Sequence, residues 1–462
     1  MPTHVIIGGG PAATNAVETI RRLDQGASRI TLISDEPAHS RMAMPYWLAN
    51  KIERDATLTG DAASFQALGV ETRFGRRVAA IDAAGKSVTL DDGNRIAFDQ
   101  LLIATGSSPI IPSIPGADLP GVQPMWTLDH ARRAIDLLAK IQEPRVVLIG
   151  AGFIGFIILN ALRKRGCRLT VIERESHILP RMLDDRAARL ATSWVTSEGV
   201  TVRTGESVSG IQAEPDGTKQ VVLASGASCP ADLVVLAVGV RANFDLAKEA
   251  GIATDQGILV DDHLRTGAAG IHAAGDAAQG PVLFSSERRV HAIHPTAVDH
   301  GRVAGANMAG QDVRYPGSLA MNVVDLHGLQ MMSFGEWNDA AAETMVIDNA
   351  AGHVYRKLLW TGDRITGAIL VGKAADLGML NDVGMIKGIM QTQAELGPWK
   401  GYLSENPFDI RRAFIGAGVP QRLVQTTLLG SPSRPRAYRP AGAEPASAVG
   451  PAHAVYVGTR PS

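Results

Sequence analysis

Apolar runs with the length and composition of buried strands recur along this chain, and glycine turns follow them. Residues 4–15 read HVIIGGGPAATN, and residues 146–159 read VVLIGAGFIGFIIL. In both stretches an apolar run of strand type meets a cluster of glycines and then a run that can be helical. This order of strand, tight turn and helix is typical of a dinucleotide-binding unit, although glycine turns also occur in sheets that bind nothing. The pattern predicts two such units in one chain.

The small residues of each turn fit particular roles in holding a dinucleotide. Gly8 lets the chain turn tightly, Gly10 lets backbone approach a pyrophosphate, and Ala13 keeps the following helix close to its sheet. In the second copy the same roles fall to Gly150, Gly152 and Gly155. Each helix then directs its N-terminus, with free N–H groups and a positive dipole end, at the phosphates.

Each turn is followed by a second apolar strand that ends in acidic residues. Residues 30–36 read ITLISDE, and residues 169–175 read LTVIERE. Glu36 and Glu173 stand where a carboxylate can accept hydrogen bonds from an adenosine ribose. For either residue taken alone, a solvated acid at a strand end is the simpler interpretation.

A third strand that leads into a glycine turn also occurs twice, in residues 99–109 (DQLLIATGSSP) and 231–243 (ADLVVLAVGVRAN). The chain therefore contains an internal repeat, and two bound dinucleotides are implied. Further along, residues 270–279 (GIHAAGDAAQ) place Asp276 after a short strand and a glycine, and a helix follows with Pro295 in its first turn.

Composition agrees with a large enzyme. With 462 residues, 45% of them hydrophobic, and a formal net charge of -1, the chain can bury more than one core and gives no sign of binding nucleic acid or a membrane surface. The first strand starts within a few residues of the N-terminus, and no apolar run is long enough to span a bilayer, so a cytoplasmic protein is expected.

The cysteines limit the chemistry. Cys167 and Cys229 are the only two and lie far apart, so the sequence contains neither a CxxC redox pair nor a disulfide framework. Two thiolates are too few for an iron-sulfur cluster of the usual kind, and no metal site is predicted.

The order of GGGPAA, SDE, ATG, GAGFIG, VIE, AVG, AAGD and HPTAV resembles the FAD- and NAD-dependent pyridine nucleotide oxidoreductases, the superfamily of glutathione reductase, ferredoxin and rubredoxin reductases and NADH oxidase. The resemblance covers about residues 4–312. It implies an α/β fold of two Rossmann-like dinucleotide-binding domains of the glutathione reductase type, followed by a small α+β C-terminal domain and a low-complexity tail. It also implies FAD in the first unit and NAD(H) in the second.

Carried over residue by residue, the resemblance assigns two sets of binding residues. Those expected to hold FAD are Gly8, Gly10, Pro11, Ala12, Ala13, Glu36, Arg41, Val78, Ala104, Thr105, Gly106, Gly275, Asp276, His294, Thr296 and Ala297. Those expected to hold NAD(H) are Gly150, Gly152, Phe153, Ile154, Gly155, Glu173 and Gly239. Hydride transfer needs no protein base, so no side chain is assigned a catalytic role beyond cofactor positioning, and His294 and His300 are also read as an ordinary helix-flanking pair.

The resemblance implies domain limits as well. The FAD-binding domain is expected in residues 1–112 and 245–312, the NAD-binding domain in 113–244, and a C-terminal interface domain in 313–428. Residues 429–462 are rich in Pro, Ala and Gly and are expected to form a flexible tail.

The absence of redox cysteines indicates which branch of the superfamily the sequence resembles. The disulfide reductases carry a CxxxxC pair over the flavin, and Met42 stands where the CoA-disulfide reductases and NADH oxidases have one cysteine. Thiol chemistry is therefore not expected. The chain also departs from the electron-transfer reductases, since Phe156 and Ile157 replace a pair that usually ends in Glu, and Tyr46 stands near the place of its Lys partner.

Two function classes remain. The first is a reductase that exchanges hydride with NAD(H) and electrons with an iron-sulfur partner such as a ferredoxin or rubredoxin, or with another subunit of an oxidoreductase, as a homo-oligomer or a hetero-complex. The second is a self-contained oxidase or peroxidase that uses oxygen or peroxide. Nothing in the sequence favours a third, non-enzymatic flavoprotein.

Overall fold

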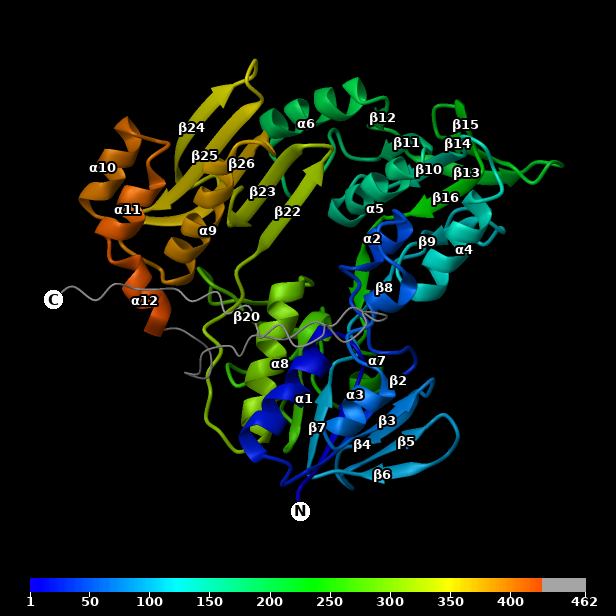
Figure 1. Ribbon diagram of the computed structural model, residues 1–462, viewed down its shortest axis with the longest axis vertical. Coiled ribbons are helices and arrows are strands. Elements are labelled where there is room, and N and C mark those ends of the chain that lie inside the picture. Colours follow the sequence, from blue (N-terminus) through cyan, green and yellow to red (C-terminus); the bar gives the residue numbers. More distant parts are fainter. Residues whose placement is uncertain (426–462) are drawn as a thin grey trace, which may run out of the picture. The chain divides into compact units, whose positions relative to one another are not determined.

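The computed structural model describes residues 1–425 (Figure 1). The expected tail, residues 429–462, and the last three positions of the expected C-terminal domain lie outside the described residues. The described chain forms two five-stranded parallel sheets of the same design, one five-stranded antiparallel sheet and several smaller sheets, together with the helices that pack on them.

The first parallel sheet has the strand order β19-β7-β1-β2-β3. Its strands are β1 (Thr3–Ile7), β2 (Arg29–Ser34), β3 (Val70–Phe74), β7 (Gln100–Ile103) and β19 (Ile271–Ala273). Val5, Ile6 and their neighbours are fully buried, in a core that also contains the helix residues Ala13 and Val303 and the meander residue Val88, which is why the strands read as continuous apolar runs. The last strand comes from far along the chain, so this unit is discontinuous in sequence.

Helices, short turns and small sheets complete the first unit. They are α1 (Pro11–Asp24), α2 (Met44–Leu48), η1 (Arg54–Thr57), α3 (Ala62–Ala67), α7 (Asp245–Glu249), η2 (Gly275–Ala277) and α8 (His294–Met308), a meander of β4 (Val78–Asp82), β5 (Ser87–Leu90) and β6 (Arg95–Ala97), and a small sheet of β18 (Ile258–Leu259), β20 (Ala278–Pro281) and β21 (Arg288–Arg289).

The second parallel sheet repeats the first, with the order β12-β11-β10-β16-β9. Its strands are β9 (Val122–Pro124), β10 (Arg145–Ile149), β11 (Arg168–Glu173), β12 (Thr201–Thr204) and β16 (Leu233–Leu236). The helices are α4 (Leu128–Leu138), α5 (Phe153–Lys164) and α6 (Asp185–Ser197), and the meander is β13 (Val208–Ala213), β14 (Lys219–Leu223) and β15 (Ser228–Ala231). The two α/β units expected from the glycine patterns are confirmed.

A pair of strands joins the two units. β8 (Ser107–Pro109) follows β7, β17 (Val240–Ala242) follows β16, and the two pair with each other antiparallel. The chain thus crosses between the units twice at one place.

Helices α1 and α8 approach each other closely because small residues meet in their interface. A Cβ atom added to Gly301 would lie 2.2 Å from the carbonyl oxygen of Ala12, and one added to Gly305 would lie 2.7 Å from that of Ala16. Since such distances cannot exist for real side chains, the separation of the two helices depends on these glycines.

The third domain has an antiparallel sheet of order β22-β23-β26-β25-β24. Its strands are β22 (Met321–Leu326), β23 (Leu329–Gly335), β24 (Glu343–Asn349), β25 (Val354–Thr361) and β26 (Arg364–Lys373), and its helices are α9 (Leu377–Gln391), α10 (Pro398–Glu405), α11 (Ile410–Gly416) and α12 (Val419–Gln425). Residues 355–362 (YRKLLWTG) and 364–372 (RITGAILVG) have a composition that predicts strands in the C-terminal domain, and they form most of β25 and β26.

Each face of this sheet packs against a hydrophobic core, while its edge strand β24 is mostly exposed. Met332 and Leu370 pack into the core shared with α9, α10 and α11, which stand beside the sheet in Figure 1. Met331 and Ile369, on the other face, join the core of the second parallel unit. Trp194 of α6 donates its indole N–H to the carbonyl oxygen of Leu326 at 2.7 Å, so α6 is tied to the end of β22.

Candidate functional site

The first glycine turn leaves open space for a ligand. Gly8 has a φ of 118°, and a Cβ atom there would lie 2.1 Å from the carbonyl oxygen of Ala104, so only glycine fits. Gly10 caps α1 without a side-chain hydrogen bond, and a Cβ atom added to it would meet nothing within 4 Å. The first N–H groups of α1 therefore face free space next to the carboxyl ends of β1 and β7.

The second turn has the same geometry. Gly150 has a φ of 101°, and a Cβ atom there would lie 2.5 Å from the carbonyl oxygen of Ala237. Gly152 caps α5 without a side-chain hydrogen bond, again with nothing within 4 Å of an added Cβ atom. A Cβ atom added to Gly155 would lie 2.8 Å from the carbonyl oxygen of Gly150, and Phe153 and Ile154 form the first turn of α5. Both turns fit the pyrophosphate of a dinucleotide.

The acidic residues after the second strands are not equivalent in the two units. Glu173 is the last residue of β11 and is buried. Its Oε2 accepts the Ala151 N–H of the glycine turn at 2.6 Å, and its Oε1 accepts the Glu175 N–H at 2.9 Å. This carboxylate therefore fixes the turn and lies directly beside it.

In the first unit the corresponding position holds Ser34, because β2 ends there rather than at the acid that the repeat led us to expect. A Cβ atom added to Gly9 would lie 2.8 Å from the Ser34 Oγ, so this turn has no room for a longer side chain. Glu36 comes two residues later and accepts the N–H of Leu128, in α4, at 3.1 Å. The expectation that Glu36 and Glu173 stand at equivalent positions of the two units is thus wrong, because Glu36 lies two residues beyond the equivalent position. The assignment of Glu36 to the FAD ribose stays a prediction.

The strands β7 and β16 lead to the place where the chain crosses between units. Thr105 donates its hydroxyl to the carbonyl oxygen of Asn243 at 2.7 Å, and the Asn243 side-chain amide donates to the carbonyl oxygen of Thr105 at 2.9 Å. Asn243 N–H also donates to Gly106, and Ile110 N–H donates to Gly239, each at 2.9 Å. Hydrogen bonds to backbone therefore connect the segment that carries Thr105 and Gly106, predicted to bind FAD, with the segment that carries Gly239, predicted to bind NAD(H).

The GD motif and α8 come together with the first turn. An added Cβ atom at Gly275 would lie 3.1 Å from the Ala12 Cβ and 3.6 Å from the Ala297 Cβ. Asp276 accepts the Ser107 hydroxyl at 2.7 Å. Helix α8 begins at His294, as expected, with Pro295 in its first turn. Burial lowers the pKa of His294, and the charge of Asp276 opposes that shift.

His300 and Thr296 are buried on α8. The His300 Nδ1 accepts the N–H of Gly275 at 3.3 Å, and its ring meets the Tyr315 ring edge-on with centroids 4.7 Å apart. Burial lowers the pKa of His300 to about 3, so it stays neutral and serves as a structural support for the GD motif.

Arg41 and Trp126 form a contact that the sequence did not reveal. The Arg41 guanidinium carbon lies 4.5 Å from the centroid of the Trp126 ring. The Trp126 indole N–H donates to the carbonyl oxygen of Ser107 at 2.8 Å. Trp126 was missed because it belongs to no glycine or acidic motif. Ser107 and Asn243 follow the glycines of residues 99–109 and 231–243 and were missed because their contacts join distant parts of the chain. The remaining predicted FAD residue, Val78, begins β4 and packs against the first core.

The residues that mark the branch occupy neighbouring helices. Met42 and Tyr46 are 51% and 58% exposed, next to or within α2, which packs against α5. Phe156 is buried, and Ile157 is partly buried against the second core. Cys167 and Cys229 are buried in different apolar clusters, and burial raises the pKa of the Cys167 thiol to about 11.

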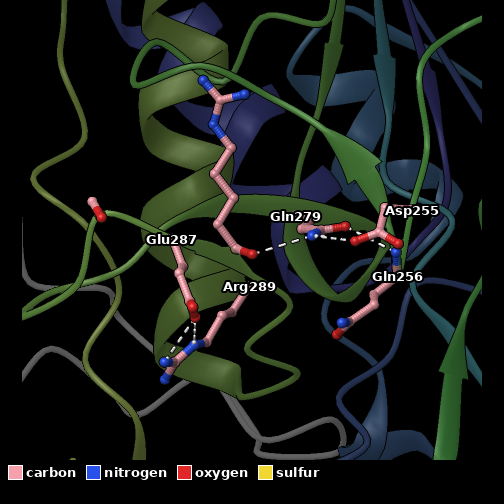
Figure 2. A pocket seen from close by; sticks show the side chains of 7 residues that line it. Asp255, Gln256, Gln279, Glu287 and Arg289 are labelled. Carbon is pink, nitrogen blue, oxygen red and sulfur yellow. Dashed lines mark hydrogen bonds and ion pairs between the residues drawn. The ribbon is translucent and has the colours of Figure 1, made fainter.

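Two further polar features lie apart from these residues. An open cavity of about 690 Å³ is shown in Figure 2, and none of its lining residues belongs to the predicted sites. The Gln279 amide donates to Asp255 at 3.0 Å, and Glu287 pairs with Arg289, so these groups are engaged with one another.

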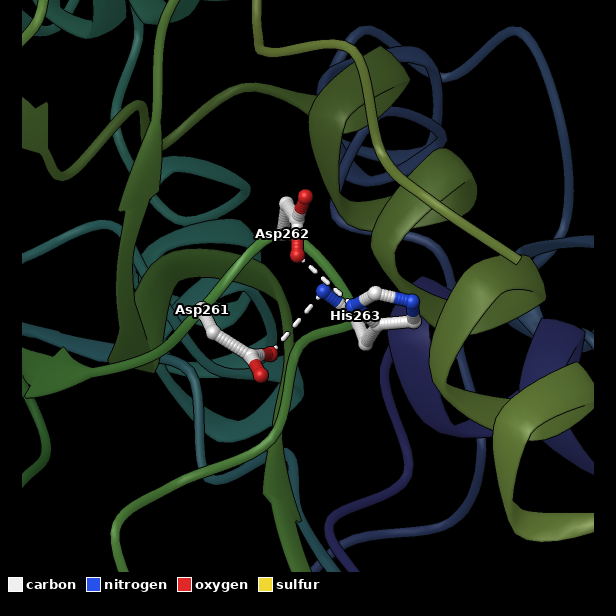
Figure 3. Close-up of side chains that lie close together, drawn as sticks. All are labelled: Asp261, Asp262 and His263. Carbon is white, nitrogen blue, oxygen red and sulfur yellow. Dashed lines mark hydrogen bonds and ion pairs between the residues drawn. The ribbon is translucent and has the colours of Figure 1, made fainter. Parts of the chain in front are cut away.

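Asp261, Asp262 and His263 lie close together, as Figure 3 shows, and within residues 1–425 they alone form a group of three potential metal ligands. The Asp261 carboxylate accepts the N–H groups of His263 and Arg265, both at 2.9 Å. The His263 ring nitrogens lie 2.7 Å from Asp262 and 2.8 Å from Asp312. The cluster therefore holds a turn together.

Two tandem α/β units, each with an uncapped helix behind a glycine turn, define a class of protein that binds two dinucleotides. A family model described as pyridine nucleotide-disulphide oxidoreductase matches residues 2–301, and the chain belongs to this family. It is an oxidoreductase that uses a flavin and a nicotinamide nucleotide. Among residues 1–425, no helix is both long and apolar enough to cross a membrane.

Several relatives refine this placement. The chain is 33% identical to the rhodocoxin reductase of Rhodococcus erythropolis, over 80% of this chain and 87% of that protein. It is 28% identical to the NADH-dependent phenylglyoxylate dehydrogenase subunit epsilon of Aromatoleum evansii, over 89% of this chain and 97% of that subunit. It spans less than half the length of two further curated relatives.

Among solved structures, a chain of the covalent putidaredoxin reductase-putidaredoxin complex matches with a TM-score of 0.81 and 22% identity, over 90% of this chain and 99% of that one. At this identity the match supports the fold.

Proposed function

We propose that this chain is an FAD-dependent NADH oxidoreductase that exchanges electrons with a separate redox partner, either an iron-sulfur protein such as a ferredoxin or rubredoxin or another subunit of a larger oxidoreductase. The observation that carries the proposal is the pair of glycine turns, since Gly10 and Gly152 each leave free space in front of an uncapped helix N-terminus. One chain with two such sites suits two dinucleotides.

The cofactors are assigned by unit. FAD is held by the first unit, through the residues named for it above, and NAD(H) by the second. A bound flavin takes hydride from NADH and releases electrons singly, so each NADH reduces two one-electron acceptors and leaves one proton. The chain contributes position and field: the N–H groups of α1 and α5 bind phosphates, and α8 directs its positive end at the reduced flavin.

The partner is proposed from the relatives and from the thiols. Rhodocoxin reductase and the epsilon subunit carry names of proteins that work with a further component. In this chain Met42, exposed two residues before α2, stands where a redox thiol would be needed, and both cysteines are buried. Electrons therefore leave for an external acceptor.

The assignment of the two sites can be tested by filling the free space in each turn. Gly10 and Gly152 both have a φ of -80°, which any residue adopts. Gly10→Val and Gly152→Val should therefore fill the space proposed for the ligand without straining the backbone. We expect Gly10→Val to lose FAD. Gly152→Val should keep FAD but lose anaerobic bleaching of the flavin by NADH. Gly384→Ala, in an open position on α9, is the control.

Steady-state assays then test the acceptor. NADH oxidation should be slow with oxygen alone and fast with an added one-electron acceptor. Recovery of FMN in place of FAD would contradict the cofactor assignment, and full turnover with oxygen or peroxide alone would establish a self-contained oxidase or peroxidase instead.

A further inference from the structure

We propose that Trp126 is a positioning residue for the flavin, whose indole holds the Arg41 guanidinium beside the first glycine turn so that it binds the diphosphate of FAD. The inference rests on the proposed function, because it takes FAD as the occupant of the first unit. It adds a residue from the start of the second unit to a site that is otherwise built by the first.

Arg41 has a cationic group that the protein leaves partly unsatisfied. Its Nε is enclosed and has no hydrogen-bond partner among residues 1–425. Burial lowers the pKa of the Arg41 guanidinium, and the charges of Asp276, Glu36 and Asp35 oppose that shift. An enclosed cation without a hydrogen-bonded anion is costly, so this arrangement suits a ligand that brings negative charge.

The guanidinium lies at the right place for such a ligand. Its Nη1 is 3.7 Å from a Cβ atom built on Gly106, the glycine that follows β7. The carboxyl end of β7 lies beside that of β1, because the two strands are parallel and Ile7 pairs with Ile103. The uncapped N-terminus of α1 follows β1 directly. A diphosphate at this edge of the sheet would meet helix N–H groups and the guanidinium together.

Trp126 is fixed in place by contacts on both sides. Its indole N–H donates to the Ser107 carbonyl at 2.8 Å, and the next residue but one, Leu128, donates its N–H to Glu36 at 3.1 Å. Thr127 caps α4 by accepting the His130 N–H at 3.1 Å, and the His130 ring accepts the Thr127 N–H at 3.2 Å. The indole plane under Arg41 is therefore rigid.

Ser107 links this contact to the GD motif. Its carbonyl accepts from Trp126, while its hydroxyl donates to Asp276 at 2.7 Å. A guanidinium stacked on an aromatic face keeps its N–H edge free for a phosphate, and the stacking removes the rotational freedom of a long side chain. Trp126 thus prepares Arg41 for the ligand without needing to touch it.

A double-mutant cycle on the full chain tests this arrangement. We expect Arg41→Gln to raise the dissociation constant of FAD roughly 100-fold, since it removes a charged hydrogen bond to phosphate. Trp126→Leu should raise it about 10-fold, the size of an enclosed cation–π contact. In the Arg41→Gln background, Trp126→Leu should have no further effect, because Trp126 acts through Arg41. The readouts are FAD retained on purification and FAD titration by flavin fluorescence.

Two more variants keep the test decisive. Trp126→Phe retains an aromatic face and should bind FAD within about threefold of the wild type even if Trp126→Leu folds poorly. Trp194→Leu is the matched control, since Trp194 also donates its indole N–H to a backbone carbonyl but lies on α6. It should lower the melting temperature and leave the dissociation constant of FAD unchanged.

The inference would be overturned if the effects of Trp126→Leu and Arg41→Gln on the dissociation constant of FAD multiply in the double variant. It would also be overturned if Trp126→Phe binds FAD as weakly as Trp126→Leu does. Neither result would contradict FAD binding itself. A wild-type protein that retains no FAD would overturn the proposed function, and this inference with it.

Discussion

Glu173 uses both of its carboxylate oxygens inside the protein, one on Ala151 and one on Glu175. A charged acceptor with two backbone donors is held firmly. At the scale of single residues, we expect this carboxylate to be the main local control over which nucleotide the second unit takes.

NADH should therefore reduce the flavin faster than NADPH, because the Glu173 carboxylate repels a 2′-phosphate. Arg174, which could attract that phosphate, pairs with Glu175 at 3.0 Å. Glu173→Gln should lower the ratio of the flavin reduction rate with NADH to that with NADPH about 10-fold, since a nearby like charge costs at least about 1.4 kcal/mol. Anaerobic stopped-flow reduction with each nucleotide measures this, with Glu214→Gln, in the turn between β13 and β14, as the control. Equal or faster reduction of the wild type by NADPH would contradict the assignment.

At the same scale of single residues, we expect the two cysteines to take no part in the chemistry. Replacing both, as Cys167→Ala with Cys229→Ala or as the two serine variants, should leave flavin-to-acceptor turnover unchanged, because buried small apolar residues take no part in the chemistry. The raised pKa of Cys167 predicts that iodoacetamide does not inactivate the native enzyme below about pH 9. Loss of turnover with flavin still bound would show that a thiol takes part in electron transfer.

At the scale of elements, the contact between α1 and α8 sets the position of the helix behind the first glycine turn. Both helices carry predicted FAD residues at their N-termini, so a shift between them moves both sides of the proposed site. Ala12 and Ala16 on α1 meet Gly301 and Gly305 on α8, so this contact is close and sensitive to volume.

Gly301→Ala should consequently destabilise the protein by on the order of 2 kcal/mol and lower its flavin content, since the added methyl group collides with the Ala12 backbone. Gly384→Ala, also within a helix but in open space, should be neutral or slightly stabilising. Differential scanning fluorimetry and the ratio of flavin to protein absorbance give both values. A Gly301→Ala protein with wild-type stability and flavin content would refute the role given to this contact.

The elements around the glycine turns could be predicted from sequence because glycine, periodicity and strand composition act locally. The repeat of two units, the start of α8 at His294 and the strands β25 and β26 all follow from such local signals. Glu36 was misplaced relative to Glu173 because register depends on where β2 ends, which the acidic residues do not show.

Trp126 could not be found in this way. Its partners Arg41 and Ser107 are distant in sequence, and an aromatic residue before a helix cap is read as ordinary core. Long-range pairs between side chains and backbone leave no periodic pattern, so the residues that complete the proposed FAD site from the second unit require the structure.

At the scale of the whole molecule, buried histidines make stability depend on pH. Burial lowers the pKa of His272 and His291 to about 4 and that of His300 to about 3. These residues gain protons near pH 6.5 only when the chain is unfolded, so the unfolded state binds more protons between pH 6.5 and about 4.

Stability should therefore be fully present above pH 6.5 and fall as the pH drops toward 4, by up to about 1.4 kcal/mol per pH unit for each histidine. His272→Leu should make this decline shallower. Chemical denaturation of the full chain at pH 7, 6 and 5 measures the slope, and the same slope in wild type and variant would mean that His272 is not responsible.

The first sheet is completed by β19, and its glycine turn is braced by α8, both of which follow the second unit in the chain. During synthesis on the ribosome, the second unit emerges whole and can fold while the first still lacks its last strand and its bracing helix. The proposed flavin site thus becomes complete only after residue 308 has left the exit tunnel. If the first unit holds the flavin as we propose, its loading is a late step of biosynthesis, and a nascent chain stalled before that point would present a finished second unit beside an open edge of the first sheet.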